Sequence, residues 1–262
     1  MRIRAAVCVV TGASSGIGRA VARDLAARGA LLCLVARRED RLRDVLREIG
    51  GGDASHSLKV ADVADRSQVE ELAAFLNDRY GRLDVLVNNA GFSGERPFLG
   101  PHAIAEVERV FATNFFGAVN CTGEMLPLLL RSAPSVIVNI ASVAGRVALG
   151  GSPGYSSSKF ALVGWSESLH FTLAPRGISV CSVEPGFIPT EGFPHHSLRR
   201  NPLARLVLGT PEEAAEAVAA TIEKPRLRVT VPRAYRVAEI AFTLLPPLYR
   251  AAGRRRARDR QR

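Results

Sequence analysis

Tyr155 and Lys159 stand four residues apart, within a stretch that has a helical pattern. Side chains at this spacing share one face of a helix, so the phenol and the ammonium would be neighbours. The pKa of a free phenol is about 10, and a nearby ammonium lowers it by favouring the phenolate. The pair could therefore give a proton to a carbonyl or take one from an alcohol. Alone, the spacing is not diagnostic, because such pairs also occur by chance on solvated helices.

A glycine-rich turn joins the first apolar segment to the first helical pattern, with the sequence Thr11-Gly12-Ala13-Ser14-Ser15-Gly16-Ile17-Gly18. Such a turn lets the backbone approach a pyrophosphate, and the helix N-terminus adds free N–H groups and about half a positive charge. The spacing is GxxxGxG, not the GxGxxG of the longer dinucleotide fingerprint. The glycines could simply form a tight turn, but their place between a first strand and a first helix favours a bound dinucleotide.

The choice of dinucleotide should be made where the second strand ends, since an acidic residue there would bind the 2′-hydroxyl of NAD(H). The sequence at this point is Ala36-Arg37-Arg38, without a carboxylate. A guanidinium pairs well with a phosphate, so the arginines predict NADP(H) in preference to NAD(H). The hydroxyls of Ser14 and Ser15 could contact the same phosphate. Alternatively, the arginines only solvate the start of the next helix.

The elements that must position these residues alternate along the chain. Strands are expected at 3–10, 31–36, 56–60, 83–87, 135–140, 178–183 and 227–231, and helices at 16–29, 39–49, 67–79, 103–131, 153–174 and 211–223. Continuously apolar strands separated by helices are typical of a parallel sheet covered on both faces. We expect one Rossmann-like, doubly wound α/β domain over 1–250 with a seven-stranded parallel sheet, and a basic tail over 251–262. Capping boxes are predicted at Ser67 with Glu70 and at Thr210 with Glu213.

Together these motifs resemble the short-chain dehydrogenase/reductase family in its single-domain form. The matching residues, in order, are Thr11-Gly12-x-x-x-Gly16-Ile17-Gly18, Asp62-Val63, Asn88-Asn89-Ala90-Gly91, Asn114, Ser142, Tyr155-x-x-x-Lys159 and Pro185-Gly186. They span residues 7 to about 190, with strands and helices between them in the expected places. The resemblance implies an oxidoreductase that transfers a hydride between the cofactor and a carbonyl or alcohol.

The resemblance also implies a role for each catalytic position. Tyr155 would donate or accept the proton, and Lys159 would lower the pKa of Tyr155 and bind the nicotinamide ribose. Ser142 would hydrogen-bond the substrate carbonyl, and Asn114 would hold a water that links Lys159 to solvent. Because every catalytic position is filled, we expect an active enzyme; the alternative from another class is a sensor that binds NADP(H) without turnover.

The residues expected to contact the cofactor come from all of these motifs. They are Gly12, Ser14, Ser15, Gly16, Ile17, Gly18, Arg37, Arg38, Asp62, Val63, Asn88, Ala90, Gly91, Tyr155, Lys159, Pro185, Gly186, Ile188 and Thr190. Two of the assignments have a structural alternative: Asn88 could satisfy backbone groups between strands, and Asp62 could cap a turn.

Composition limits the other functions. The formal charge is +10, but residues 250–262 hold seven arginines and one aspartate, which makes a net +6. This tail lacks interleaved aromatic residues, so we expect no nucleic-acid partner. The four cysteines lie far apart, and three of them sit inside apolar runs and are expected to be core residues in a reducing cytoplasm. His195 and His196 lack further ligands at suitable spacing, so no metal is expected.

The substrate and the partners are less well defined. Loops at 92–102 and 143–152, and an apolar segment at 187–209 that also carries arginines, would form the substrate site, which favours a hydrophobic alcohol or ketone. A 3-oxoacyl chain on an acidic carrier is the alternative. Residues 234–250 form an apolar helical pattern before the arginines, which could contact a membrane, the substrate cleft or another subunit. By resemblance to the family, a homodimer or homotetramer is expected.

Overall fold

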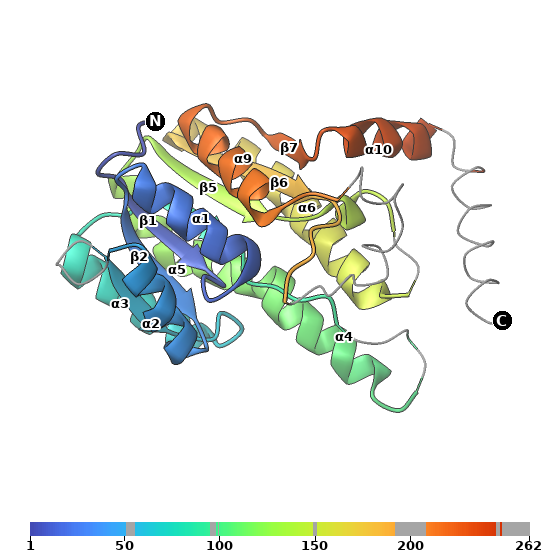
Figure 1. The fold of residues 1–262 in the computed structure, drawn as a ribbon, viewed down its shortest axis with the longest axis horizontal. Helices are drawn as coiled ribbons and strands as arrows, with labels where there is room; N and C mark the ends of the chain where they lie inside the picture. The colour runs from blue at the N-terminus through green and yellow to red at the C-terminus, as the bar shows by residue number, and fades with distance from the viewer. Residues whose placement is uncertain are drawn as a thin grey trace.

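The computed structural model describes residues 1–50, 56–94, 98, 100–148, 151–191, 208–244 and 247. Its centre is one parallel sheet of seven strands in the order β3-β2-β1-β4-β5-β6-β7. The strands are β1 (Val7–Thr11), β2 (Leu31–Ala36), β3 (Ser57–Val60), β4 (Val85–Asn88), β5 (Ser135–Ile140), β6 (Ile178–Pro185) and β7 (Arg228–Val231). The order reverses between β1 and β4, as in a doubly wound fold, so the predicted fold class is confirmed (Figure 1).

Helices cover both faces of this sheet. One apolar core joins the sheet to α1 (Gly16–Ala27), α2 (Glu39–Glu48) and α9 (Pro211–Glu223). A second core joins it to α3 (Arg66–Tyr80), α5 (Gly117–Arg131) and the end of α6 (Pro153–Leu173). The strands are buried on both sides, which explains why they are apolar at successive positions. All four cysteines are buried, whereas burial was predicted for three of them.

Two predicted elements differ most from the structure. The first strand begins at Val7 and not at residue 3, because Ala5 adopts a left-handed φ of 64° and Ala6 N–H donates to the Ile3 carbonyl. The predicted helix 103–131 is interrupted: α4 (Ala103–Phe111) passes into a π-helical turn at Ala112–Phe116 before α5 begins. Such turns are rare and often occur at functional sites.

The two predicted capping boxes had different outcomes. Thr210 Oγ1 accepts from Glu213 N–H, and the Glu213 carboxylate accepts from Thr210 N–H, so this box is confirmed. At α3 the cap is Asp65, whose carboxylate accepts from the N–H groups of Ser67 and Gln68. The box predicted at Ser67 was wrong, because the helix begins earlier, at Arg66, and Asp65 is its N-cap.

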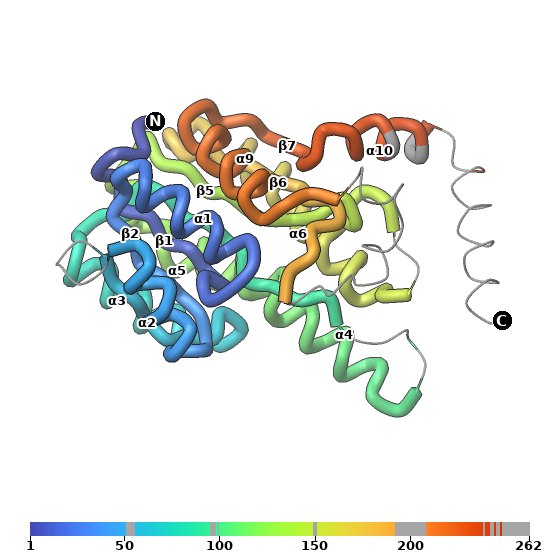
Figure 2. Tube along the Cα trace, in the orientation of Figure 1, coloured from blue at the N-terminus to red at the C-terminus, as the bar shows by residue number. Residues whose placement is uncertain are grey.

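The chain continues past β7 into α10 (Ala234–Leu244), which leaves the body of the molecule at one end (Figure 2). In the part of the chain that the structure describes, no helix has the length and apolar character that a membrane crossing requires. The basic tail at 251–262, and most of the apolar segment at 187–209, lie outside the described residues.

Candidate active site

The sheet topology gathers the predicted site residues at one edge. Segments that follow β1, β2, β4, β5 and β6 all begin where these parallel strands end, so they meet at the carboxyl edge. A cavity of about 460 Å³ lies there. Its lining includes these predicted residues: Gly12, Ser14, Ser15, Gly16, Ile17, Arg37, Arg38, Asp62, Val63, Ala90, Gly91, Ser142, Tyr155, Lys159, Pro185, Gly186, Ile188 and Thr190.

The glycine turn is too closely packed to hold a side chain at Gly18. A Cβ on Gly18 would lie 2.3 Å from the Gly12 carbonyl oxygen and 2.4 Å from Asn89 Nδ2, so Gly18 allows α1 to start close beneath β1. Ser15 is the N-cap of α1, but its side chain makes no capping hydrogen bond, and the first turn holds no acidic residue. Ser15 thus leaves the N–H groups at this helix end uncapped, and Ser15, Gly16 and Ile17 line the cavity, an arrangement that suits a pyrophosphate.

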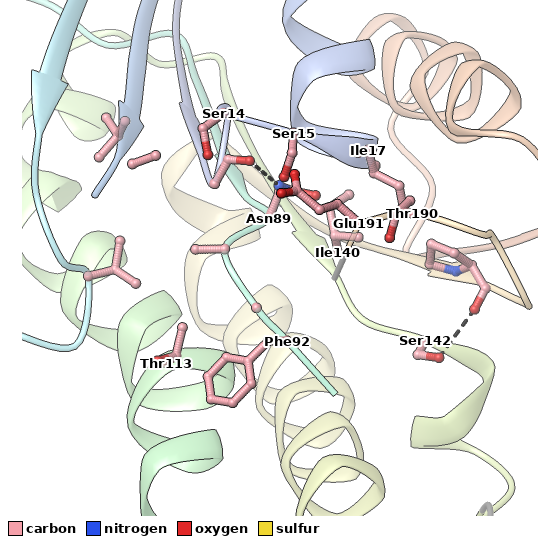
Figure 3. A pocket seen from close by; sticks show the side chains of 18 of the residues that line it. Ser14, Ser15, Ile17, Asn89, Phe92, Thr113, Ile140, Ser142, Thr190 and Glu191 are labelled. Atoms are coloured by element: carbon pink, nitrogen blue, oxygen red, sulfur yellow. Dashed lines mark hydrogen bonds between the residues drawn. The ribbon is translucent and has the colours of Figure 1, made fainter. Parts of the chain in front are cut away.

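Arg38 spans one end of the cavity. Its Nη2 donates to Ser14 Oγ at 3.1 Å and to Ser15 Oγ at 2.9 Å, and its Nη1 pairs with Glu191 Oε1 at 3.0 Å. Ser14, Ser15 and Glu191 lie together in Figure 3. Arg37 Nη1 lies 3.4 Å from Asp62 Oδ2. The Arg38 guanidinium thus contacts two hydroxyls beside the glycine turn, Arg37 lines the same cavity, and strand β2 ends without a carboxylate.

Ser142 and Tyr155 meet at the opposite end. Ser142 caps the short 3₁₀ turn Val143–Gly145, and its Oγ donates to the Pro185 carbonyl at 3.2 Å, the hydrogen bond drawn at Ser142 in Figure 3. Burial raises the pKa of Tyr155 to about 12, although a hydrogen bond with Ser142 acts in the opposite direction. At neutral pH the phenol is therefore protonated, the state required of a proton donor.

Lys159 lies beneath Tyr155 on the same face of α6. Its Nζ donates to the Ile140 carbonyl at 2.8 Å and lies 5.9 Å from the centre of the Tyr155 ring. Burial lowers the pKa of Lys159 to about 8. The predicted lowering of the Tyr155 pKa is not seen in this arrangement, because burial outweighs the other influences on the phenol. The ammonium still adds positive charge to the site at neutral pH.

Asn114 occupies the π-helical turn and is almost fully buried. Its Oδ1 accepts from Phe92 N–H at 3.0 Å, and its Nδ2 donates to the Phe92 carbonyl at 2.9 Å and to Ser158 Oγ at 3.2 Å. These contacts hold the loop after β4 against α6. Because the side-chain amide makes these hydrogen bonds, the predicted water would have to bind the main chain of Asn114. The role of Asn114 in a proton relay stays a prediction.

Neighbouring asparagines at the end of β4 point in different directions. Asn88 Nδ2 donates to Thr122 Oγ1 at 3.1 Å and to Asn139 Oδ1 at 2.9 Å, inside the helical layer. It does not line the cavity, and neither does Gly18, so both act on the site through its framework. Asn89, by contrast, lines the cavity and donates to the carbonyl of Thr11 at 2.9 Å.

Several lining residues were not predicted: Val35, Ala36, Ala61, Phe92, Thr113, Ile140, Ala141 and Glu191. Each lies within two positions of a predicted residue, so nearness in the sequence was the available signal. Among the described residues, no three His, Cys, Asp or Glu side chains gather as a metal site would require. His195 and His196 lie outside the described residues.

A doubly wound sheet whose glycine turn, serine, tyrosine and lysine share one cavity defines a class of dinucleotide-dependent oxidoreductases. Residues 6–200 match the model of the family described as short chain dehydrogenase. The chain belongs to this family of oxidoreductases, as the resemblance predicted.

Related proteins include ketoacyl reductases. The chain is 34% identical over 225 residues to 3-oxoacyl-(acyl-carrier-protein) reductase FabG of Thermotoga maritima, covering 83% of this chain and 90% of that protein. It is 40% identical over 191 residues to the granaticin polyketide synthase putative ketoacyl reductase 1 of Streptomyces violaceoruber, covering 70% and 68%. A short-chain dehydrogenase/reductase from Burkholderia phymatum, solved in complex with NAD, has a TM-score of 0.82 and 26% identity, covering 95% and 96%.

Proposed function

We propose that this oxidoreductase uses NADPH to reduce hydrophobic ketones. The observation that carries the cofactor choice is the position of Arg38, whose guanidinium contacts both Ser14 and Ser15 beside the glycine turn. A 2′-phosphate placed there would receive charge-assisted hydrogen bonds from Arg38 and donors from two hydroxyls. NAD(H) has only a neutral hydroxyl at this position, without the negative charge that strengthens these hydrogen bonds.

The catalytic end supports reduction. When bound, the cofactor supplies the hydride that is added to the carbonyl carbon. Ser142 Oγ would hold the carbonyl oxygen, and the protonated Tyr155 hydroxyl would deliver the proton to that oxygen as it becomes an alkoxide. Lys159, with its ammonium buried beside the phenol, would stabilise the phenolate that remains.

A second cavity, of about 290 Å³, lies on the other side of Tyr155 and supports a hydrophobic substrate. Phe98, Pro101, Val107, Val110 and Pro153 supply its apolar walls. Such a pocket suits an alkyl or acyl chain attached to the reacting carbonyl. Because several relatives are named as ketoacyl reductases, 3-oxoacyl thioesters are the second candidate substrate class.

A panel of ketones, aldehydes and 3-oxoacyl thioesters of increasing chain length, assayed with NADPH and NADH, tests this proposal. We expect turnover to prefer NADPH and kcat/KM to rise with chain length until the second cavity is filled. A preference for carrier-bound 3-oxoacyl chains over free ketones would favour the second class. Tight NADPH binding without turnover of any member would favour the sensor instead.

The variant Arg38→Gln tests the cofactor choice within the same assay. Loss of a charge-assisted hydrogen bond costs about 1.5–3 kcal/mol, so kcat/KM for NADPH should fall about ten- to hundredfold. The value for NADH should change by about twofold or less. Arg41→Gln is the control, because Arg41 is exposed on the helix that Arg38 precedes and lies outside the cavity. An equal loss with both cofactors would contradict the assignment of Arg38 to the phosphate.

Two surfaces favour contacts with partners. Phe160 and Phe171 are exposed on α6 and lie about three helical turns apart, hence on one face, which supports a homodimer or homotetramer. Val237, Ile240 and Leu244 form an exposed apolar row on α10, and the arginines of 250–262 follow it in the sequence. An apolar row that clustered arginines follow in the sequence suits the surface of an anionic membrane.

One sedimentation experiment tests both contacts. The chain alone should sediment as a dimer or tetramer, and it should pellet with vesicles that contain anionic lipid but not with vesicles of zwitterionic lipid. Removal of residues 251–262 should weaken the vesicle binding and leave turnover in solution unchanged. A monomer, or equal binding to both kinds of vesicle, would count against the corresponding proposal.

A further inference from the structure

A cluster of charged side chains lies beside the catalytic end of the cavity without lining it. Its centre is Glu184, which is 0% exposed. Arg146 Nε lies 3.2 Å and 3.4 Å from the two carboxylate oxygens of Glu184, and Arg228 Nε lies 2.7 Å from one of them. Arg146 also pairs with Glu167 on α6, and Arg228 with Glu239 on α10. A buried carboxylate held by two guanidiniums has little freedom to move.

The cluster joins the two segments that hold the Ser142 hydroxyl. Glu184 directly precedes Pro185, whose carbonyl accepts the hydrogen bond from Ser142 at 3.2 Å. Arg146 follows Ser142 by four residues, immediately after the 3₁₀ turn that Ser142 caps. The Arg146–Glu184 ion pair therefore holds the Ser142 turn against the end of β6, and it fixes both partners of the Ser142 hydrogen bond.

The same cluster reaches the C-terminal helix. Arg228, on β7, contacts Glu184 on one side and Glu239 of α10 on the other. Tyr235, on the first turn of α10, packs on the segment after Glu184: a Cβ on Gly186 would lie 2.3 Å from the Tyr235 ring. The Tyr235 hydroxyl also accepts from Phe187 N–H at 3.4 Å. Helix α10 thus contacts the Pro185–Phe187 segment both directly and through the charges.

We propose that Glu184, Arg146, Arg228 and Glu239 are positioning residues that hold Ser142 in place and couple α10 to catalysis. The part of this inference that concerns turnover rests on the proposed function; the part that concerns the Ser142 turn does not. None of the four lines the cavity, so neither substrate nor cofactor is expected to touch them. A buried ion pair is a weak source of stability, but it can fix geometry, and small displacements of a catalytic group reduce rates strongly.

The test compares Glu184→Gln and Glu239→Gln with Glu216→Gln, an exposed glutamate on α9. Hydrogen exchange, read by mass spectrometry, reports on the fold without any turnover. We expect faster exchange over residues 142–147 and 186–187 in the first two variants and no change in the control. Unchanged exchange in Glu184→Gln would overturn the positioning role, whatever the substrate proves to be. If Glu184→Gln fails to fold, Glu239→Gln and Arg228→Lys, which leave the central carboxylate in place, decide by the same criterion.

Kinetics then separate positioning from binding. Glu184→Gln should lower kcat about ten- to hundredfold, and Glu239→Gln should lower it less, while the Kd for NADPH changes by about twofold or less. In single-turnover measurements, Glu184→Gln should cause no further loss in a Ser142→Ala background, because it acts through Ser142. Additive losses would overturn that coupling. If exchange changes as expected but the protein turns over no carbonyl, the proposed function is refuted and the positioning role of the cluster stands.

Discussion

Replacement of Tyr155 by phenylalanine is expected to lower kcat about 10²- to 10⁴-fold, the usual contribution of a general acid. The ring would keep its packing, so the Kd for NADPH should change little. The physical reason is that the phenol, whose pKa burial raises to about 12, is the protonated group beside Ser142 at the catalytic end of the cavity. Single-turnover rates and NADPH titration measure the two effects separately.

Tyr80→Phe is the matched control. The Tyr80 hydroxyl hydrogen-bonds Ser57 Oγ at 2.8 Å, far along the chain from the catalytic motifs and outside the cavity. Its loss should alter stability by about 1 kcal/mol and leave kcat unchanged. Turnover that survives in Tyr155→Phe at the level of this control would refute Tyr155 as the proton donor.

Lys159→Met should separate activity from stability. Loss of the buried ammonium removes the charge that favours the phenolate, so kcat should fall about 10²-fold or more. Burial of that ammonium also destabilises the fold. It lowers the pKa of Lys159 from 10.5 to about 8, which corresponds to a loss of about 3 kcal/mol in the free energy of unfolding at neutral pH. The methionine variant avoids this loss but also lacks the hydrogen bond to Ile140, which contributes about 1 kcal/mol. The inactive variant should therefore be at least as stable as the wild type at pH 7.

The dependence on pH distinguishes this explanation from a simple packing effect. Between pH 8 and about 10.5 the unfolded chain binds the Lys159 proton and the folded chain has released it, so the contribution of Lys159 to the unfolding free energy rises with pH. The difference in stability between Lys159→Met and the wild type should shrink over this interval. Lys224→Met, at an exposed lysine, should show no such trend. In the wild type, kcat/KM should decline above pH 8. A constant difference from pH 7 to pH 10 would contradict a buried ammonium.

Local sequence patterns predicted most of the strands and helices, because buried parallel strands are continuously apolar. They also placed the site, since the ends of parallel strands must meet at one edge. Asn88 and Asn89 show where this reasoning stops: adjacent positions on a strand face opposite directions, and only the packed structure shows which of them reaches the cavity.

Properties that depend on distant segments could not be predicted. The pKa of Tyr155 is set by burial, which the spacing of Tyr155 and Lys159 does not specify. The ion pairs of Glu184 join residues from β6, β7 and the turn after Ser142, which are far apart in the sequence. Helical periodicity did not indicate the π turn at Asn114 either, since the helix on each side of a single wider turn keeps its own apolar pattern.

The burial of the cysteines has a practical consequence. Burial raises the pKa of Cys33 to about 11, of Cys121 to about 12 and of Cys181 to about 11, and it raises that of Cys8 further. Thiolates are the reactive form, so the native thiols should be inert to maleimides while the protein is folded. A single cysteine introduced on the exposed face of α10 would then carry a fluorophore without any change to the native cysteines. The movement of that helix during turnover could be followed directly.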